Sequence, residues 1–130
     1  MTSSLPSNFC IIVGGQKCGT STLYAHLSEH SNICPCYKKE PHVFGKEKYI
    51  LDIDKYKNMW KKKWNGKKHV YAIEASTSYT NFPIRTTAPN HLVARRMYDF
   101  KRRSKSNIKC IFIIRDPFSR IESYILKEYI

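Results

Sequence analysis

The chain has 130 residues, enough for one domain with a hydrophobic core, and its formal net charge of +13 comes from 23 Lys and Arg against 10 Asp and Glu. Such a charge favours anionic partners: nucleotides, sulfated glycans, nucleic acids or acidic lipids. No apolar run approaches the ~18 residues of a membrane span, which excludes a membrane-spanning protein as written. Five irregularly spaced cysteines exclude a disulfide framework.

A buried strand, a glycine-rich turn and a helix start follow one another near the N-terminus. The apolar residues 9–13 predict the strand, Gly14 and Gly15 begin the turn, and the helix begins at Thr20. Backbone N–H groups of such a turn can close around a phosphate, while the helix N-terminus and Lys17 add positive charge. The segment therefore predicts an anion-binding site.

The spacing in this turn differs from that of the ATP-binding loop, G-x-x-x-x-G-K-[ST]. Gly14 and Gly19 have the required separation, but Thr20 stands where the lysine belongs, and Lys17 lies inside the turn. A lysine on the turn approaches the phosphates from the side, where a bridging oxygen would lie. This arrangement argues against an ordinary kinase or ATPase.

A second strand, turn and helix occur near the C-terminus. Residues 109–114 predict a strand buried on both faces, Asp116 can cap the following helix, and Pro117 suits its first position. Arg115 then leaves the end of the strand, and Ser123 lies nearly two turns into the helix. This places a guanidinium and a hydroxyl around one anion.

The two segments together resemble the 5′-phosphosulfate loop and the 3′-phosphate site of sulfotransferases that use 3′-phosphoadenosine 5′-phosphosulfate (PAPS). The resemblance implies that Lys17 is catalytic and stabilises charge on the bridging oxygen. The cofactor-binding residues that it implies are Lys17, Cys18, Gly19, Thr20, Ser21, Thr22, Arg115 and Ser123.

Residues 38–44, KKEPHVF, resemble the Lys-Glu-Pro-His-Phe-Phe segment of the carbohydrate, or heparan sulfate-type, branch of this family. The resemblance implies that Glu40 is the catalytic base and that Lys39 and His42 contact the substrate. Val43 replaces the first aromatic residue of the segment.

Residues 73–79 resemble the Glu-x-(Ser/Thr)-x-x-Tyr stretch of the family and imply a substrate contact by Glu74. Ala75 stands where several glycan enzymes have a lysine. With this stretch, the resemblance extends from residue 9 to residue 124.

The predicted elements form a βαβ series, which implies an α/β, three-layer, P-loop-like fold with a parallel sheet flanked by helices. Ligands of such sheets bind at the carboxyl ends of the strands, where the turn, Glu74 and Arg115 fall. The helical spacing of Tyr56, Trp60 and Trp64 favours core contacts over base stacking. The predicted strands are 9–13, 70–74 and 109–114, and the predicted helices are 20–29, 53–64, 89–103 and one from residue 117.

The resemblance predicts that residues 9–130 are the N-terminal portion of a sulfotransferase domain, truncated at the C-terminus, after a disordered tail of residues 1–8. The missing part would supply further sheet, so we expect exposed apolar surface on the last strand and helix. Cys10 and Cys110 are expected to pack in core strands. Residues 1–8 lack a signal-peptide core, which indicates a cytoplasmic protein, or a Golgi protein if a targeting part is missing.

The function that the resemblance implies is transfer of a sulfuryl group from PAPS to a hydroxyl or amine of a carbohydrate or other anionic acceptor. No metal is expected, since the binding residues already stabilise the leaving group, and no nucleic-acid-binding motif is present. Two alternatives stay open: a P-loop nucleotide kinase, and a non-catalytic fragment that binds PAPS or its product, 3′-phosphoadenosine 5′-phosphate (PAP).

Overall fold

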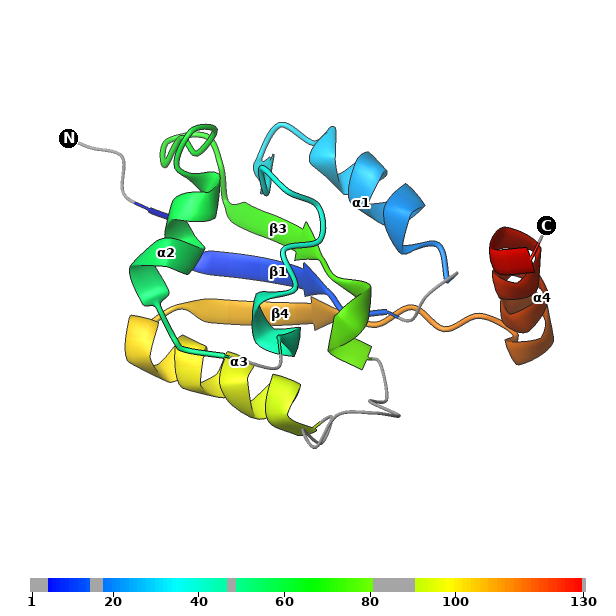
Figure 1. Cartoon of the computed structure of the whole chain (residues 1–130). Coiled ribbons are helices and arrows are strands. Elements are labelled where there is room, and N and C mark those ends of the chain that lie inside the picture. Colours follow the sequence, from blue (N-terminus) through cyan, green and yellow to red (C-terminus); the bar gives the residue numbers. More distant parts are fainter. Residues whose placement is uncertain (1–4, 15–17, 47–48, 81–90, 130) are drawn as a thin grey trace.

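The computed structural model describes residues 5–14, 18–46, 49–80 and 91–129, and a four-stranded parallel sheet lies at its centre (Figure 1). This arrangement confirms the predicted α/β class. The strands in sheet order are β2 (Ile33–Pro35), β3 (Tyr71–Ala75), β1 (Asn8–Ile12) and β4 (Asn107–Ile111).

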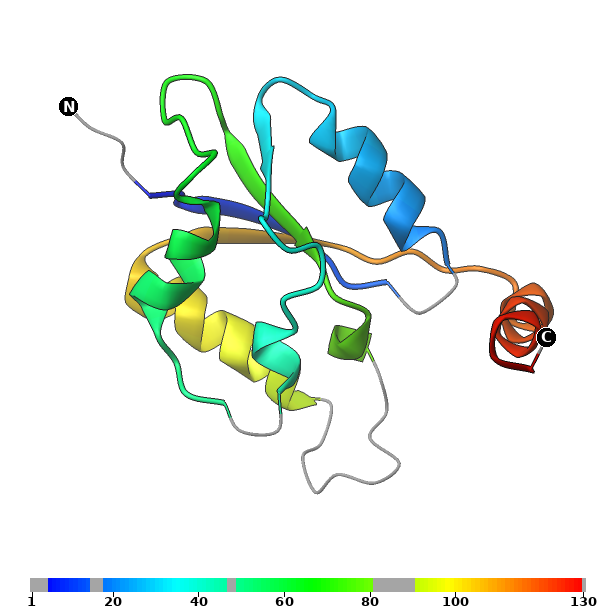
Figure 2. The ribbon, with the colours of Figure 1, turned by 45° about the horizontal axis from the view of Figure 1, so that its top comes forward.

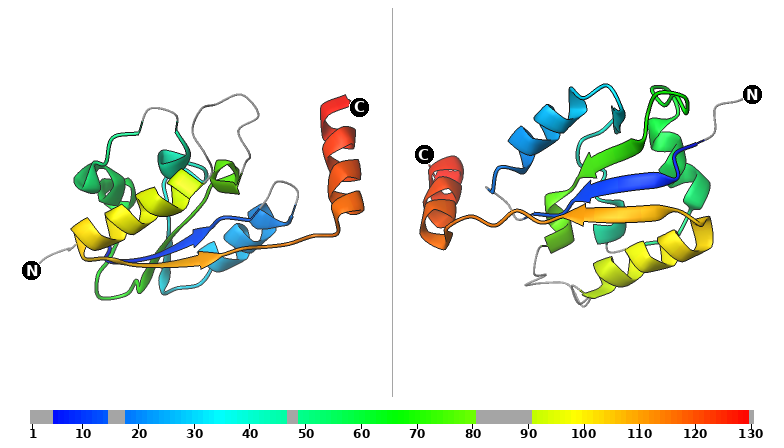
Figure 3. Two further views of the ribbon diagram at one scale, coloured as in Figure 1. Left: turned by 90° about the horizontal axis from the view of Figure 1, so that it is seen from below. Right: turned by 180° about the vertical axis from the view of Figure 1, so that it is seen from behind.

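Helices cover both faces of the sheet, as parallel strands joined by crossovers require. Figure 3 shows α1 on one face and α2 and α3 on the other, whereas α4 stands apart at the carboxyl end of the strands (Figure 2). The helices are α1 (Thr20–Ser28), α2 (Ile53–Lys57), α3 (His91–Ser104) and α4 (Pro117–Tyr129), with 3₁₀ turns η1 (Val43–Gly45), η2 (Asn58–Trp60) and η3 (Thr77–Thr80).

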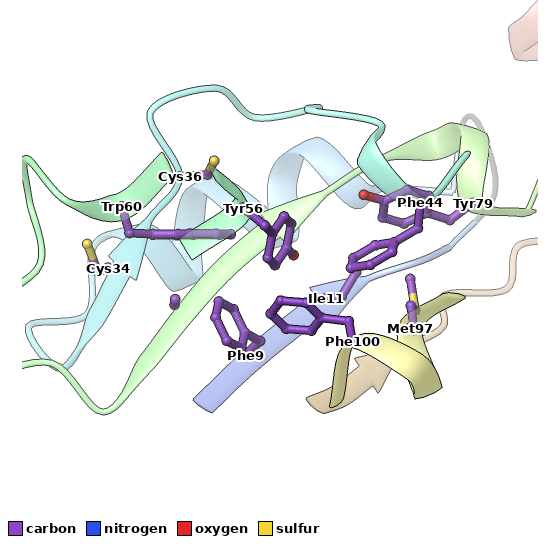
Figure 4. Packing of buried hydrophobic residues seen from close by; sticks show 11 residues of the cluster. Phe9, Ile11, Cys34, Cys36, Phe44, Tyr56, Trp60, Tyr79, Met97 and Phe100 are labelled. Carbon is purple, nitrogen blue, oxygen red and sulfur yellow. The ribbon is translucent and has the colours of Figure 1, made fainter. Parts of the chain in front are cut away.

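An aromatic cluster fills the space between the sheet and the α2–α3 layer (Figure 4). The ring of Phe9 on β1 lies 5.4 Å from Tyr56, 5.3 Å from Trp60 and 5.4 Å from Phe100, measured between centroids. Tilted and edge-to-face contacts of this kind add to the free energy of burial. The predicted core positions of Tyr56 and Trp60 are thus confirmed, and Met97 joins Phe100 on the buried side of α3.

The strand β2 has no counterpart in the sequence prediction. It has three residues and contains Pro35, yet Ile33 pairs with Tyr71 of β3, and the N–H of Cys36 donates to the carbonyl of Ile73 at 3.0 Å. A proline is tolerated because β2 is an edge strand of this sheet. So short a strand leaves no periodic pattern to detect in the sequence.

The predicted last strand is wrong in position and in burial. β4 covers Asn107–Ile111 instead of residues 109–114, and Cys110 is exposed rather than packed in the core. Phe112 and Ile114 follow the strand and are 58% and 82% exposed. The reason is that β4 is the edge strand of the described sheet, and α4 turns away instead of covering it. The expected apolar surface is therefore present.

Two other boundaries differ from the sequence prediction. The helix predicted over residues 53–64 is α-helical only to Lys57 and continues as η2. Within the tail that was predicted to be disordered, Pro6 is buried and Asn8 already belongs to β1. Among the described residues, no helix has both the length and the hydrophobicity needed to cross a membrane.

Candidate active site at the carboxyl end of the sheet

The turn after β1 passes very close to the chain that follows β4. The Val13 N–H donates to the Ile111 carbonyl at 2.8 Å. A Cβ added to Gly14 would lie 2.9 Å from the backbone nitrogen of Ile113 and 3.2 Å from Cγ2 of Thr20. Only glycine fits at this crossing, which brings the two predicted anion-binding segments to one end of the sheet. Residues 15–17, including the predicted catalytic Lys17, lie outside the described residues.

The start of α1 is open to an anion. Gly19 is its N-cap with φ of +87°, a left-handed conformation that favours glycine. No side chain in the described part of the chain caps the helix, and its first turn contains no acidic residue. Its first N–H groups and the positive end of the helix dipole therefore remain available. Cys18 and Thr20 are buried, whereas Ser21 and Thr22 are exposed at this helix start.

The loop between β2 and η1 lies beside this helix start. Nζ of Lys39 donates a hydrogen bond of 2.7 Å to Oγ of Ser21 in the first turn of α1. The carbonyl of the same lysine accepts from the N–H of Ala75, at the end of β3, at 3.0 Å. Lys39 thus joins the loop to both β3 and the predicted phosphate-binding helix.

Glu40 lies in this loop with its carboxylate half-buried and oriented. Its Oε1 accepts a hydrogen bond of 3.0 Å from the Thr77 N–H. Burial raises the pKa of Glu40, but hydrogen bonds from Thr77 and the charges of Lys39 and His42 together bring it below the usual value. The carboxylate is therefore ionised at neutral pH and able to accept a proton.

His42 is held in an uncommon conformation next to Glu40. Its φ is +55°, in the left-handed region that few non-glycine residues adopt. Its N–H donates to Oγ of Ser76 at 3.0 Å, and its Nδ1 lies 2.6 Å from Oγ of Ser78. Two serines from the end of β3 and η3 therefore fix both the backbone and the ring of this histidine.

The structure does not support the predicted substrate contact by Glu74. The side chain is fully buried, and its oxygens accept hydrogen bonds from Tyr56 at 2.7 Å, Tyr79 at 2.8 Å and Ser76 at 2.8 Å. Burial raises the pKa of Glu74 to about 7, although the three hydroxyls act in the opposite direction. Because Oγ of Ser76 also accepts the N–H of His42, Ser76 links the buried Glu74 to the loop that carries Glu40 and His42.

Arg115 follows β4 and Ser123 belongs to α4, and the chain after β4 leads to α4 at the same end of the sheet as the start of α1 (Figure 1). The predicted helix start is confirmed: α4 begins at Pro117, and Asp116 accepts the Ser119 N–H at 3.0 Å. Ser123 belongs to α4, which stands apart from the sheet and its other helices, so its part in a 3′-phosphate site stays a prediction.

All five cysteines are free thiols, and no group of three metal-ligating side chains gathers within the described ranges. Two tyrosines that sequence reasoning did not connect with the site, Tyr56 and Tyr79, prove to hold Glu74. Tyr79 belongs to the Glu-x-(Ser/Thr)-x-x-Tyr stretch and was within reach of a sequence argument. Tyr56 was assigned to the core from its spacing alone.

No family model and no curated protein matches the chain. Among solved structures, a sulfotransferase from Alicyclobacillus acidocaldarius is similar over 97% of this chain, with 28% sequence identity and a TM-score of 0.67. The similarity covers 52% of that enzyme, so the chain spans about half of its length. The chain thus has the P-loop-like fold of a sulfotransferase, with sequence similarity to that enzyme along nearly all of its residues.

Proposed function

We propose that residues 9–130 form the N-terminal, nucleotide-binding portion of a PAPS-dependent sulfotransferase that acts on a hydroxyl or amine of a carbohydrate. One observation carries the proposal: the uncapped start of α1 and the loop with Glu40 meet through the hydrogen bond between Lys39 and Ser21. An anion-binding helix start and an ionised carboxylate are thereby neighbours. The similarity to a solved sulfotransferase supports the same reaction class.

The proposed reaction is an in-line transfer. Glu40 takes the proton of the acceptor hydroxyl or amine as the new bond to sulfur forms. The bond between sulfur and the bridging oxygen breaks, and its electron pair leaves with PAP, where Lys17 stabilises the developing charge. The N–H groups at the start of α1 hold the 5′-phosphate, and Arg115 with Ser123 holds the 3′-phosphate.

A transfer assay with ³⁵S-labelled PAPS and a panel of oligosaccharides tests the function directly. Labelled product supports the proposal. Mg²⁺-dependent hydrolysis of ATP without sulfuryl transfer would indicate a nucleotide kinase instead. Tight binding of PAP without turnover on any acceptor would indicate a nucleotide-binding protein with no transferase activity.

The 3′-phosphate site gives the first prediction. PAP should bind more tightly than ADP, and Arg115→Ala should weaken PAP binding by about 1.5–3 kcal/mol, the range for hydrogen bonds to charged groups. Ser123→Ala should cost less, because a neutral hydroxyl is lost. Titration calorimetry measures the affinity of each variant for PAP. Arg102→Ala, at the exposed C-terminal end of α3, is the control for the loss of one positive charge. Equal affinity for PAP and ADP would contradict a dedicated 3′-phosphate site.

Lys17 gives a prediction about rate rather than affinity. In the sequence, Lys17 comes before the start of α1 instead of within it, and we propose that it acts on the bond that breaks; Lys17→Ala should then lower kcat by about 10²-fold, as loss of one oxyanion donor does. Steady-state kinetics of the transfer reaction measures this, with the exposed Lys38→Ala as the control. An unchanged kcat with a raised KM would instead assign Lys17 to uniform substrate binding.

A further inference from the structure

The segment between η2 and β3 carries an unusual density of positive charge. Residues 61–68, KKKWNGKK, hold five lysines, and residues 55–73 contain no Asp or Glu. All five lysines are exposed, and among the residues that the structure describes none of them forms an ion pair. This lysine loop lies at the amino end of the sheet, opposite α4 and the candidate active site (Figure 1).

Hydrogen bonds within the lysine loop give it a defined shape. The Trp64 N–H donates to the Trp60 carbonyl at 2.9 Å, and the Lys67 N–H donates to Oδ1 of Asn65 at 3.0 Å. The Asn65 N–H donates to Nδ1 of His69 at 2.9 Å. Because these hydrogen bonds already order the backbone of the lysine loop, less conformational entropy is lost when a ligand binds to it.

The lysine loop borders an open hollow of about 340 Å³ against the end of α1. Its lining combines lysine ammonium groups, serine hydroxyls, two imidazoles and one carboxylate. The polar lining residues are Ser28, Glu29, His30, Ser31, Lys63, Lys68 and His69.

The two imidazoles of the hollow are set as donors. Nδ1 of His69 accepts from Asn65, and Nδ1 of His30 accepts the Asn32 N–H at 3.1 Å, so Nε2 is the nitrogen of each ring that can donate. Burial and the neighbouring Lys68 lower the pKa of His69, which keeps that ring neutral at pH 7. The hollow thus offers lysine charges and imidazole N–H donors to an anion, and it offers serine hydroxyls and the Glu29 carboxylate to the hydroxyls of a sugar.

We propose that the lysine loop and this hollow bind a segment of an acidic polysaccharide, at a site distinct from the candidate active site. A sulfated or carboxylated sugar chain matches the lining, because it presents anionic groups together with hydroxyls. A single-stranded nucleic acid fits less well, since it requires exposed rings on which bases stack. Trp60 is 1% exposed, and Trp64 packs against the core.

The test compares two variants that lose the same charge. Lys63→Gln/Lys67→Gln/Lys68→Gln neutralises the lysine loop, and Lys101→Gln/Arg102→Gln/Arg103→Gln neutralises the exposed end of α3. A fluorescent heparin-derived octasaccharide is titrated by anisotropy at several salt concentrations. The loop variant should bind at least about tenfold more weakly, with a slope of log K against log salt shallower by about 2, since each lost contact removes roughly 0.7–0.9. The α3 variant should change by less than about threefold.

Three outcomes would overturn the proposal. Equal losses in the two variants would show attraction by net charge alone, and an unchanged loop variant would place the ligand elsewhere. Tighter binding of an oligo(U) of equal charge would indicate a nucleic-acid site. PAP binding by the loop variant should equal that of the wild-type chain, which separates this inference from the proposed sulfuryl transfer. Circular dichroism confirms that both variants fold.

Discussion

Replacing Glu40 with Gln should lower the rate of sulfuryl transfer by about 10²–10⁴-fold, the usual contribution of a positioned base. The amide oxygen of Gln can still accept the Thr77 N–H that orients the carboxylate at 3.0 Å. The loop should therefore keep its position, and only the ability to take a proton is lost. The affinity for PAP should stay at the wild-type value, because Glu40 has no role in holding the phosphates.

Two measurements together make this prediction specific: kcat from the transfer assay and the Kd of PAP from calorimetry. His42→Ala is the comparison, since that histidine lies two residues away and is fastened by Ser76 and Ser78. Its effect on kcat should be milder. If Glu40→Gln retains near wild-type transfer while His42→Ala abolishes it, the histidine is the base.

Local signals in the sequence were sufficient for much of the fold. The Asp116–Pro117 pair predicts the start of α4 because it supplies both the cap and the first helical residue. The spacing of Tyr56 and Trp60 predicts their burial because one helical face must cover the sheet. These features depend on residues close together in the chain.

Features that depend on distant segments were not predictable in the same way. The burial of a strand depends on what covers its faces and edges, so the apolar run after Lys109 suggested a central strand where the structure has an edge. The same limit applies to the candidate site. The motif placed Glu74 at the end of a strand, but its partner Tyr56 lies 18 residues earlier in α2, and η2 and a loop separate the two residues in the sequence. Only the fold shows that the carboxylate points inward.

Glu74 should make the free energy of unfolding depend on pH. The folded-state pKa of about 7 lies above the ordinary value of 4.5, so the folded chain binds more protons than the unfolded chain between these values. Stability from this group is therefore complete below pH 4.5 and declines as the pH rises to 7. A shift of about 2.5 pKa units at about 1.36 kcal/mol per unit corresponds to a decline of about 3 kcal/mol in the free energy of unfolding.

Glu74→Gln should remove this decline, because the amide does not titrate. Urea unfolding followed by circular dichroism between pH 4.5 and 8 measures it, and the difference between wild type and variant cancels the contributions of the histidines. The exposed Glu122→Gln on α4 is the matched control and should follow the wild-type curve. A wild-type chain and a Glu74→Gln variant with parallel pH profiles would contradict the assignment.

Glu74→Gln should also affect the candidate site, through the hydroxyl of Ser76. Oγ of Ser76 donates to Glu74 and accepts the N–H of His42. An ionised Glu74 therefore orients the Ser76 proton toward the core, and the lone pairs of Oγ remain free to accept the N–H of His42 in the loop. In the Glu74→Gln variant, the side-chain amide nitrogen would donate to Ser76 instead, and the serine proton would lose its buried acceptor. The amide of His42 should then exchange hydrogen faster in this variant than in the wild-type chain, while the amides of α4 keep their rates. Unchanged exchange at His42 would show that Glu74 stabilises the core without positioning the loop.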